Sequence, residues 1–230
     1  MNVGANSVTD TGLYFQWGDT QGYTAAQVGE GEGQKYFGQD DCIYYNDGSY
    51  TKYNSTDGNI TLKPTDDAVT AAWGGNWRMP TVSEWQALGE AVNSAWTADY
   101  QGSGVSGLVL TDKTDSSKVL FFPACGYANY GGVRNVDDFG RYWSSSLDAD
   151  YGEYCAYYMN NFDSDGVYWD SDGNRCSGYS VRGVYTGDKP SGTVGKVLGT
   201  TILDSERTKW NNAANNCVTS TTSGLKIEVV

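Results

Sequence analysis

Residues 73–85 read WGGNWRMPTVSEW and carry the clearest local signal in the chain. Thr81 follows Pro80 and is itself followed three residues later by Glu84, which is the capping-box pattern of a helix N-terminus. Apolar residues then recur at helical spacing, so the sequence predicts a helix over 82–94 that packs on a core. The apolar face of this helix consists of Val82, Trp85, Leu88 and Val92.

A shorter helix is predicted immediately upstream, within residues 62–73. Thr65 or Asp66 would cap it, acids fill its first turn, and the glycine pair at 74–75 would end it. Arg78, which follows the glycines, is expected to pair with an acid or with a backbone carbonyl. The tryptophans expected in the core are Trp73, Trp77, Trp85 and Trp143.

Short apolar runs bounded by Gly, Asp and Asn predict strands elsewhere. Residues 13–17 are typical of a buried strand, and 107–110 with 118–122 of a hairpin. Residues 21–60 are rich in Gly, Asp, Asn and Tyr, so we expect surface loops there. The remaining predicted strands are 141–145, 155–160, 166–169, 179–184 and 225–230.

The stretch 123–184 has an unusual composition, in which Tyr, Asn, Asp, Ser and Gly surround a few apolar blocks. Tyr offers a large contact area with only two side-chain torsions to order, while the small polar residues offer adaptable hydrogen bonding. An ordinary polar loop region is the simpler interpretation. Aromatic residues this dense favour a recognition surface.

The formal net charge of the 230-residue chain is −13 at pH 7. This argues against a nucleic-acid partner, since phosphate binding needs a basic footprint, and against an anionic membrane surface. The acidity serves either solubility or a cationic partner. Residues 1–4 have no basic start and no apolar run behind them, so we expect no signal peptide. No segment approaches the ~20 apolar residues of a membrane span, so we expect no membrane insertion.

Histidine is absent, which removes the commonest general base and metal ligand. The five cysteines are widely separated, odd in number and without a CxxC pair, which fits neither a zinc site nor a disulfide framework well. We therefore expect free thiols, with one or two bridges as the alternative. The cysteines are Cys42, Cys125, Cys155, Cys176 and Cys217.

Six motifs occur in an order that resembles a known family. They are Asn2-Val3-Gly4-Ala5, Tyr14-Phe15-Gln16-Trp17-Gly18, Trp73-Gly74-Gly75-Asn76-Trp77-Arg78-Met79-Pro80-Thr81, Phe122-Pro123-Ala124, Tyr142-Trp143-Ser144-Ser145-Ser146 and Ser180-Val181-Arg182-Gly183-Val184. Together they resemble the C-type-lectin-fold domains of gut Bacteroidetes and their phages. The closer resemblance is to the variable proteins of diversity-generating retroelements, which are related to the Fibrobacter succinogenes major paralogous domain.

The resemblance implies an α+β domain over 1–184 with the C-type lectin fold, that is, two helices, a small antiparallel sheet and extensive irregular loops. Its last third, 123–184, would be the ligand surface, which adenine-templated mutagenesis changes while the scaffold stays intact. Relatives carry a further strand before Asn2, which residues 225–230 or a neighbouring subunit could replace. The extension 185–230 lies outside the resemblance, and we expect it to mediate oligomerisation, such as trimer formation, or attachment to a larger particle.

The family pattern places variable, ligand-binding positions between fixed ones. The fixed positions, expected to point inward, are Tyr142, Trp143, Phe162, Trp169 and Val181. The variable positions before Tyr142 are Tyr127, Tyr130, Arg134, Asn135, Phe139 and Arg141. Those after it are Asp148, Asp150, Tyr151, Tyr154, Cys155, Tyr158, Asn160, Asp163, Tyr168, Asp170, Asp172, Cys176 and Ser177.

Three acidic runs raise the question of calcium, which takes several carboxylate and carbonyl oxygens. They are 66–67, 137–138 and 163–166. The first is better explained by acids at a helix start, and the last lacks the glutamate that an EF-hand loop requires. The Glu-Pro-Asn and Gln-Pro-Asp motifs of sugar-binding animal lectins are absent. We expect no cofactor and no metal, with calcium as the alternative.

The rival class of function is an enzyme. Residues 76–85 also resemble the formylglycine-generating enzymes, which share the C-type lectin fold and work through two nearby cysteines. Cys155 and Cys176 are the only pair in a comparable region, and the surrounding signature is missing. No spacing singles out two carboxylates for glycoside hydrolysis. We therefore expect no catalysis.

The composition and the resemblance together predict a ligand-binding protein diversified by a retroelement. The first expectation is a phage tail-tip adhesin in the virion, which recognises a protein or glycan receptor on a bacterial surface. The alternatives are a bacterial cell-surface binding protein and a purely structural module of a virion or cell surface.

Overall fold

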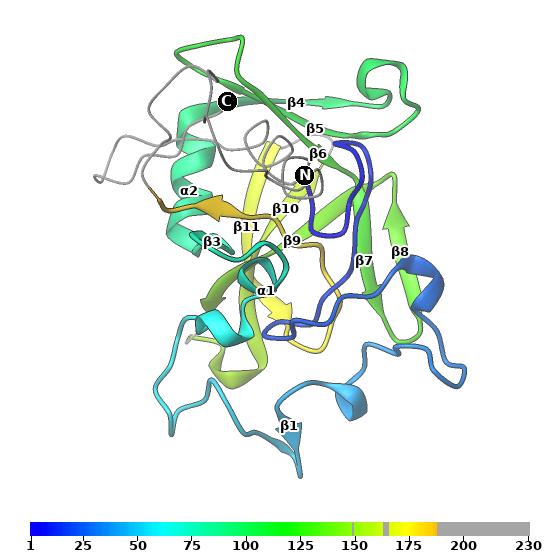
Figure 1. The fold of residues 1–230 in the computed structure, drawn as a ribbon, viewed down its shortest axis with the longest axis vertical. Helices are drawn as coiled ribbons and strands as arrows, with labels where there is room; N and C mark the ends of the chain where they lie inside the picture. The colour runs from blue at the N-terminus through cyan, green and yellow to red at the C-terminus, as the bar shows by residue number, and fades with distance from the viewer. Residues whose placement is uncertain (149, 163–165, 188–230) are drawn as a thin grey trace, which may run out of the picture.

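The computed structural model describes residues 1–148, 150–162 and 166–187. This part of the chain is α+β, with two α-helices, several small sheets and long loops (Figure 1). For Phe162 and Tyr168 the description covers the backbone alone. Predictions that concern Asp163, the acidic run at 163–166, Cys217, the strand at 225–230 and the extension beyond 187 lie outside the described residues.

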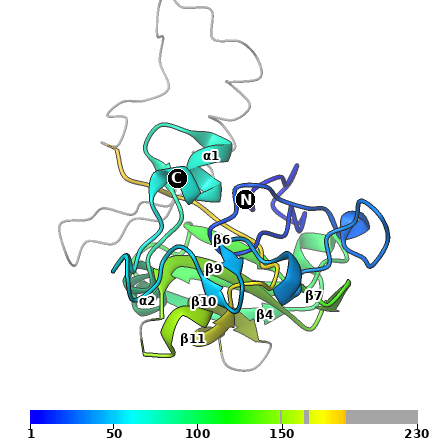
Figure 2. The same ribbon diagram turned by 90° about the horizontal axis from the view of Figure 1, so that it is seen from below.

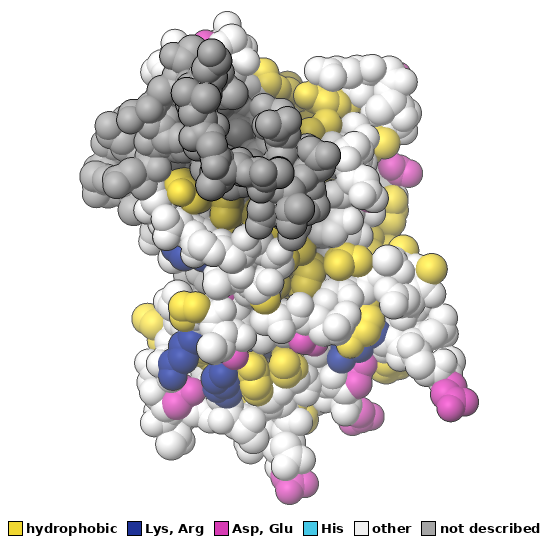
Figure 3. Space-filling model, viewed as in Figure 1, with side chains coloured by type: hydrophobic (Ala, Val, Ile, Leu, Met, Phe, Trp, Pro, Cys, Tyr) yellow, Lys and Arg dark blue, Asp and Glu magenta, His cyan; other side chains and the backbone are white. Residues whose placement is uncertain are grey.

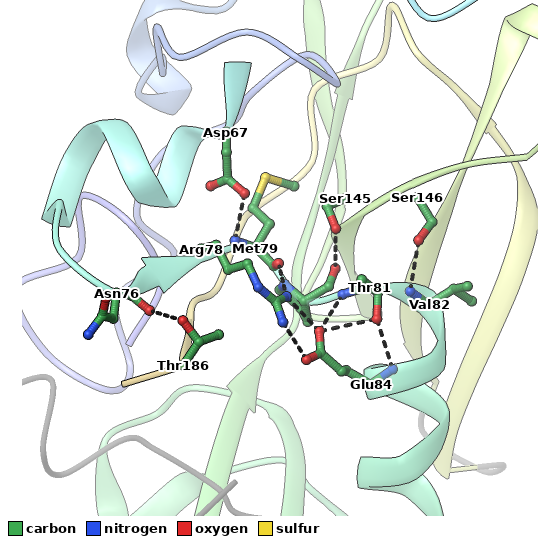
Figure 4. Close-up of polar contacts among 11 residues, drawn as sticks. Asp67, Asn76, Arg78, Met79, Thr81, Val82, Glu84, Ser145, Ser146 and Thr186 are labelled. Atoms are coloured by element: carbon green, nitrogen blue, oxygen red, sulfur yellow. Dashed lines mark hydrogen bonds and ion pairs between the residues drawn. The ribbon is translucent and has the colours of Figure 1, made fainter. Parts of the chain in front are cut away.

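The helix predicted from the capping box is α2, Val82–Ala91. Thr81 Oγ1 accepts the Glu84 N–H at 3.3 Å, and the Glu84 carboxylate accepts the Thr81 N–H at 2.8 Å. The same carboxylate accepts hydrogen bonds from both Nη groups of Arg78, at 2.7 and 2.6 Å (Figure 4). This confirms that Arg78 pairs with an acid. The helix ends at Ala91 rather than at residue 94, because Val92 begins a strand.

The second helix is α1, Ala68–Trp73, and the predicted cap was wrong by one or two residues. Asp67, rather than Thr65 or Asp66, occupies the N-cap position. One of its carboxylate oxygens accepts the N–H groups of the second and third helical residues, both at 2.9 Å. Gly74, with φ of 66°, ends the helix as predicted.

Asp66 is therefore not a helix-start acid. It lies in a 3-10 turn, Pro64–Asp66, and is buried. Its carboxylate accepts hydrogen bonds from Lys52, from the Tyr53 hydroxyl and from the Tyr44 hydroxyl, the last at 3.0 Å. This buried carboxylate attaches the loop before it to α1, which is one reason why residues 21–60 are ordered despite having little regular structure.

The largest sheet has five strands in the order β11-β10-β9-β7-β8. Neighbouring strands are antiparallel except β7 and β9, which meet in parallel at Gly126 and Gly140. The strands are β7 (Cys125–Asn129), β8 (Gly132–Val136), β9 (Phe139–Leu147), β10 (Cys155–Phe162) and β11 (Gly166–Asn174). Three of them were predicted, with shorter bounds, whereas the β7–β8 hairpin was not.

A three-stranded sheet contains the predicted hairpin, β5 (Gly107–Asp112) with β6 (Val119–Pro123). Its third strand, β4 (Val92–Thr97), pairs along the whole of β5 and was not predicted. Two minor sheets have two strands each. They consist of β1 (Tyr45–Asn46) with β2 (Ser49–Tyr50), and of β3 (Trp77–Arg78) with β12 (Val184–Tyr185).

The stretch 13–17 is mostly buried, as predicted, but it makes isolated bridges rather than a strand. Tyr14 pairs with Tyr23, and Phe15 pairs with Tyr179. The N-terminus also closes onto the end of the domain, because the Val3 N–H donates to the Val181 carbonyl at 3.0 Å.

The five-stranded sheet separates two hydrophobic clusters. On one face α2 and the three-stranded sheet pack against Tyr142 and Met159. On the other face α1 and the N-terminal segment pack against Trp143 and Tyr158. Figure 2 shows α1 and the N-terminal loops, in cyan and blue, on one side of strands β9, β10 and β11.

The tryptophan predictions were correct in part. Trp85 and Trp143 are buried, whereas Trp73 and Trp77 are only partly buried and meet edge to face with 5.3 Å between ring centroids.

The prediction of free thiols was wrong for two cysteines. Cys42 and Cys176 form a disulfide, with their Cα atoms 4.7 Å apart and a sequence separation of 134. The bond joins the long loop region before α1 to the turn after β11. Cys125 and Cys155 are free thiols, the first buried and the second half-buried.

Candidate ligand-binding face

Many of the predicted variable positions lie on the face of the five-stranded sheet that also carries Trp143, part of which α1 and the N-terminal segment cover. Cross-strand partners share a face, and Asn160 lies opposite Arg141, Tyr158 opposite Asp170. We call this set the recognition face; it consists of Tyr127, Arg134, Phe139, Arg141, Tyr158, Asn160, Asp170 and Asp172. The opposite face carries Tyr142, Met159 and Trp169, which pack against the α2 cluster.

The centre of the recognition face is Arg141, which is half-buried among aromatic rings. Its guanidinium carbon lies 4.4 Å from the ring centroid of Tyr127, 5.0 Å from that of Tyr158, 5.4 Å from that of Tyr179 and 5.5 Å from that of Phe139. Nη1 donates to the Tyr179 hydroxyl at 2.9 Å. A cation stacked on aromatic faces in this way is attracted by the ring quadrupoles.

Two carboxylates flank the aromatic rings. The Tyr158 hydroxyl lies 3.1 Å from Asp170 Oδ2 and 3.0 Å from Asp172 Oδ1. Burial raises the pKa of Tyr158 well above its usual value, so its hydroxyl keeps its proton at neutral pH. A single hydroxyl proton serves only one carboxylate at a time, and carboxylates accept several hydrogen bonds. This edge of the face is therefore rich in acceptors.

The β7–β8 turn forms one end of the face. Tyr130 and Gly131 connect the strands, both with positive φ, 42° and 71°. This backbone is typical of a two-residue hairpin turn. Tyr130 is 56% exposed, and its ring lies 6.0 Å from that of Tyr36 in an edge-to-face pair.

A second exposed group lies in the loop between β9 and β10. Asp150, Tyr151 and Tyr154 are exposed there, the two tyrosines at 63% and 51%. The ring of Tyr154 meets that of buried Tyr50 edge to face at 5.7 Å. Both exposed groups combine aromatic area with polar neighbours, as a contact surface requires.

Burial removes five predicted positions from the set of surface contacts. Asp148 accepts the N–H groups of Asp150 and Tyr151 inside its loop, Cys176 is in the disulfide, and Tyr158 lies under Arg141. The five buried positions, which the sequence did not distinguish from exposed ones, are Asp148, Tyr158, Asn160, Cys176 and Ser177. The exposed or half-exposed positions are Tyr127, Tyr130, Arg134, Asn135, Phe139, Arg141, Asp150, Tyr151, Tyr154, Cys155, Asp170 and Asp172.

The fixed positions can be assessed for four of the five residues. Tyr142, Trp143 and Val181 are buried, and Trp169 is partly buried against the α2 cluster, so these four point inward as predicted.

Three residues important to this region were missed from the sequence. Tyr36 contacts Tyr130 edge to face but lies far upstream of it in sequence. Tyr179 binds Arg141, and Arg175 binds the backbone of two loops. The tyrosine-rich composition of 21–60 was the only available signal for Tyr36, and Arg175 carried none, because its partners are carbonyl groups distant in sequence.

Among the residues that the structure describes, no group of three or more Asp, Glu or Cys is arranged to hold a metal ion. Burial, and then the carboxylates of Asp172 and Asp148, raise the pKa of the Cys155 thiol. In the view of Figure 3 few Lys and Arg side chains are visible, and carboxylates lie along the lower and right edges. None of the helices in the described ranges has the length and apolarity that a membrane crossing would need.

Comparison with known proteins gives no relative from which a function could be transferred. No protein-family model, no curated protein and no solved structure matches the chain.

Proposed function

We propose that this chain is a ligand-binding protein with the C-type lectin fold, whose contact side chains are exchangeable while its frame is not. The observation that carries the proposal is the alternation along β9 and β11. Arg141 and Asp170 face the recognition side, and their neighbours Tyr142 and Trp169 pack against the α2 cluster on the other side. Replacing the first group leaves the second group in place, as retroelement diversification requires.

The expected carrier is a phage tail tip that adheres to a bacterial surface receptor, and a bacterial cell-surface binding protein is the alternative. Support comes from the composition of the exposed positions. Tyr130, Tyr151 and Tyr154 are large aromatic side chains that stand more than half exposed, which is costly without a partner. The acidic net charge of −13 fits a protein or glycan receptor better than nucleic acid.

The enzyme alternative has less support. Cys176, one of the two cysteines on which that alternative depended, is bonded to Cys42. The raised pKa of Cys155 keeps its thiol protonated and poorly nucleophilic.

The deciding experiment has a genomic and a binding part. The DNA flanking the coding region is sequenced for a reverse transcriptase and a near-copy of the segment that encodes 123–184. The fluorescently labelled full chain is then incubated with a panel of gut Bacteroidetes cells. We expect strain-selective binding that is lost in the triple variant Tyr130→Ser, Tyr151→Ser, Tyr154→Ser. Binding that is equal for all strains and for the triple variant would refute the proposal.

A further inference from the structure

The positive charge of Arg141 has no carboxylate partner within the described residues. The ion pairs found there involve Lys35, Lys52, Arg78 and Lys118. The one hydrogen bond that the Arg141 side chain makes there is to a neutral hydroxyl, that of Tyr179, and its buried Nε has no hydrogen-bond partner among the described residues. The surrounding rings stabilise this half-buried guanidinium, but not all of its N–H groups have an acceptor.

A second side chain with an unpaired polar atom lies opposite Arg141 on the neighbouring strand. Asn160 is opposite Arg141 in the β9–β10 register and is only 1% exposed. Its side-chain oxygen is buried without a hydrogen-bond partner. Buried acceptors are almost always paired in native proteins. Unpaired buried atoms also occur at Trp85, Asp148, Arg175 and Arg182, but here a donor and an acceptor lie on residues that face each other across two strands.

The groups around Arg141 restrict which kind of ligand could bind its guanidinium. A planar guanidinium fork matches a carboxylate, which accepts two parallel hydrogen bonds. Asp170 and Asp172 nearby repel a second negative charge but accept hydrogen bonds from hydroxyl groups. The rings of Tyr127 and Phe139, inclined by only 16°, offer an apolar platform of half-exposed aromatic surface.

We propose that the recognition face binds a sugar acid, that is, a monosaccharide unit carrying one carboxylate. The carboxylate binds Arg141, neighbouring hydroxyl groups donate to Asp172, and the sugar ring lies against Tyr127. The inference rests on the proposed function and specifies its receptor as a glycan that contains uronic or sialic acid. An acidic peptide fits less well, because its successive carboxylates would meet Asp170 and Asp172.

The test uses the full chain and small probes, so it does not depend on knowing the receptor. Binding of D-glucuronate and N-acetylneuraminate is measured by ligand-observed NMR and calorimetry, beside D-glucose, the methyl ester of glucuronate and the peptide acetyl-Glu-Glu-Glu-amide, which carries successive carboxylates. Ligands of this size are expected to bind with a dissociation constant on the order of 1 mM. Loss of a charge-assisted hydrogen bond weakens binding by about 10- to 100-fold.

We expect at least one of the two acids to bind, its neutral analogues to bind at least tenfold more weakly, and Arg141→Met to abolish the difference. Lys118→Met removes one positive charge from the distant β5–β6 hairpin and should leave the affinity unchanged. Should Arg141→Met fail to fold, Arg141→Lys replaces it, because it keeps the charge and loses the fork. Equal binding of acid and ester, tighter binding of the peptide than of either acid, or full affinity in the Arg141 variant would overturn the inference. Strain-selective cell binding without acid binding would overturn it and leave the proposed function standing.

Discussion

A β-carbon added to Gly89 would lie 2.2 Å from Cη2 of Trp169, so the Trp169 ring of strand β11 packs directly against the backbone of helix α2, where a larger residue would displace it. Alanine favours a helix over glycine by about 1 kcal/mol, but overpacking costs about 1–3 kcal/mol. We therefore expect Gly89→Ala to destabilise the fold by about 1 kcal/mol, measured by urea denaturation. In a Trp169→Leu background the same change should become stabilising. Stabilisation in both backgrounds would show that the ring moves aside freely.

The Arg78–Glu84 pair should make stability depend on pH. Burial opposes the charge of Glu84, but hydrogen bonds from Arg78 and from the Thr81 backbone outweigh it, so the pKa of this carboxyl lies below its ordinary 4.5. A lowered folded-state pKa contributes stability above the unfolded-state value, and this contribution is lost as pH falls through the folded-state value.

We expect Glu84→Gln to lower the free energy of unfolding by about 1–3 kcal/mol at pH 7. The difference between variant and wild type should shrink as pH falls below 4.5. Urea denaturation at pH 7, 5 and 3 measures it, with exposed Glu90→Gln as the matched control. A difference that stays constant over this range would contradict the assigned pKa direction.

Removing the Cys42–Cys176 bond should have a large effect on stability. A cross-link between residues 134 apart restricts the unfolded chain strongly, and losing it costs about 2–5 kcal/mol. We expect Cys42→Ser with Cys176→Ser to lower Tm by about 4–20 °C, since 1 kcal/mol corresponds to about 2–4 °C for a domain of this size. Cys155→Ser is the control for a cysteine replacement near the same loops and should change Tm little. An unchanged Tm in the double variant would show that the bridge is dispensable.

Elements with a local signal were predictable from the sequence, and elements formed by distant contacts were not. The capping box at Thr81 located α2, and paired apolar runs located the β5–β6 hairpin. Strand β4 was missed because its first residue, Val92, continues the helical pattern of α2. The partner of the strand is residues 107–112, so no local pattern marks it. The β7–β8 hairpin was missed because its turn places a tyrosine, Tyr130, at positive φ, where Asn or Gly is usual.

The sequence located the region of the candidate site but did not show which of its residues are buried. The resemblance correctly assigned Tyr142 and Trp143 to the core, whereas strand alternation alone would place these neighbours on opposite faces, one of them outward. Alternation tells the two faces of a strand apart. It does not reveal that another segment covers part of the outward face. Tyr158 points the same way as Arg141 but lies beneath Arg141 and Tyr179. The partner of Cys176 was equally unpredictable, because widely spaced cysteines do not determine their own pairing.

Arg175 should be essential for holding two loops together. Its Nη1 donates to the carbonyls of Tyr53 and Glu153 at 3.0 and 2.8 Å, and the guanidinium lies 3.9 Å from the ring centroid of Tyr50. Arg175→Met would leave buried carbonyl groups unpaired, at about 1–3 kcal/mol each. We expect a loss of about 3 kcal/mol or more on this basis, with faster amide exchange in the loop around Tyr53. Exchange that accelerates uniformly over the chain would argue against a local role.

If contact residues are separate from frame residues, replacing the first should change stability little and replacing the second should lower it strongly. Tyr130, Tyr151 and Tyr154 are each more than half exposed, so replacing all three with Ser should change the free energy of unfolding by less than about 1 kcal/mol. Trp143 is fully buried, and its Nε1 donates to the Phe15 carbonyl at 2.8 Å. Trp143→Leu should therefore cost about 3–5 kcal/mol. Denaturant titration of both variants measures the contrast. If the triple tyrosine variant lost as much stability as Trp143→Leu, those tyrosines would be part of the frame and could not be exchanged freely.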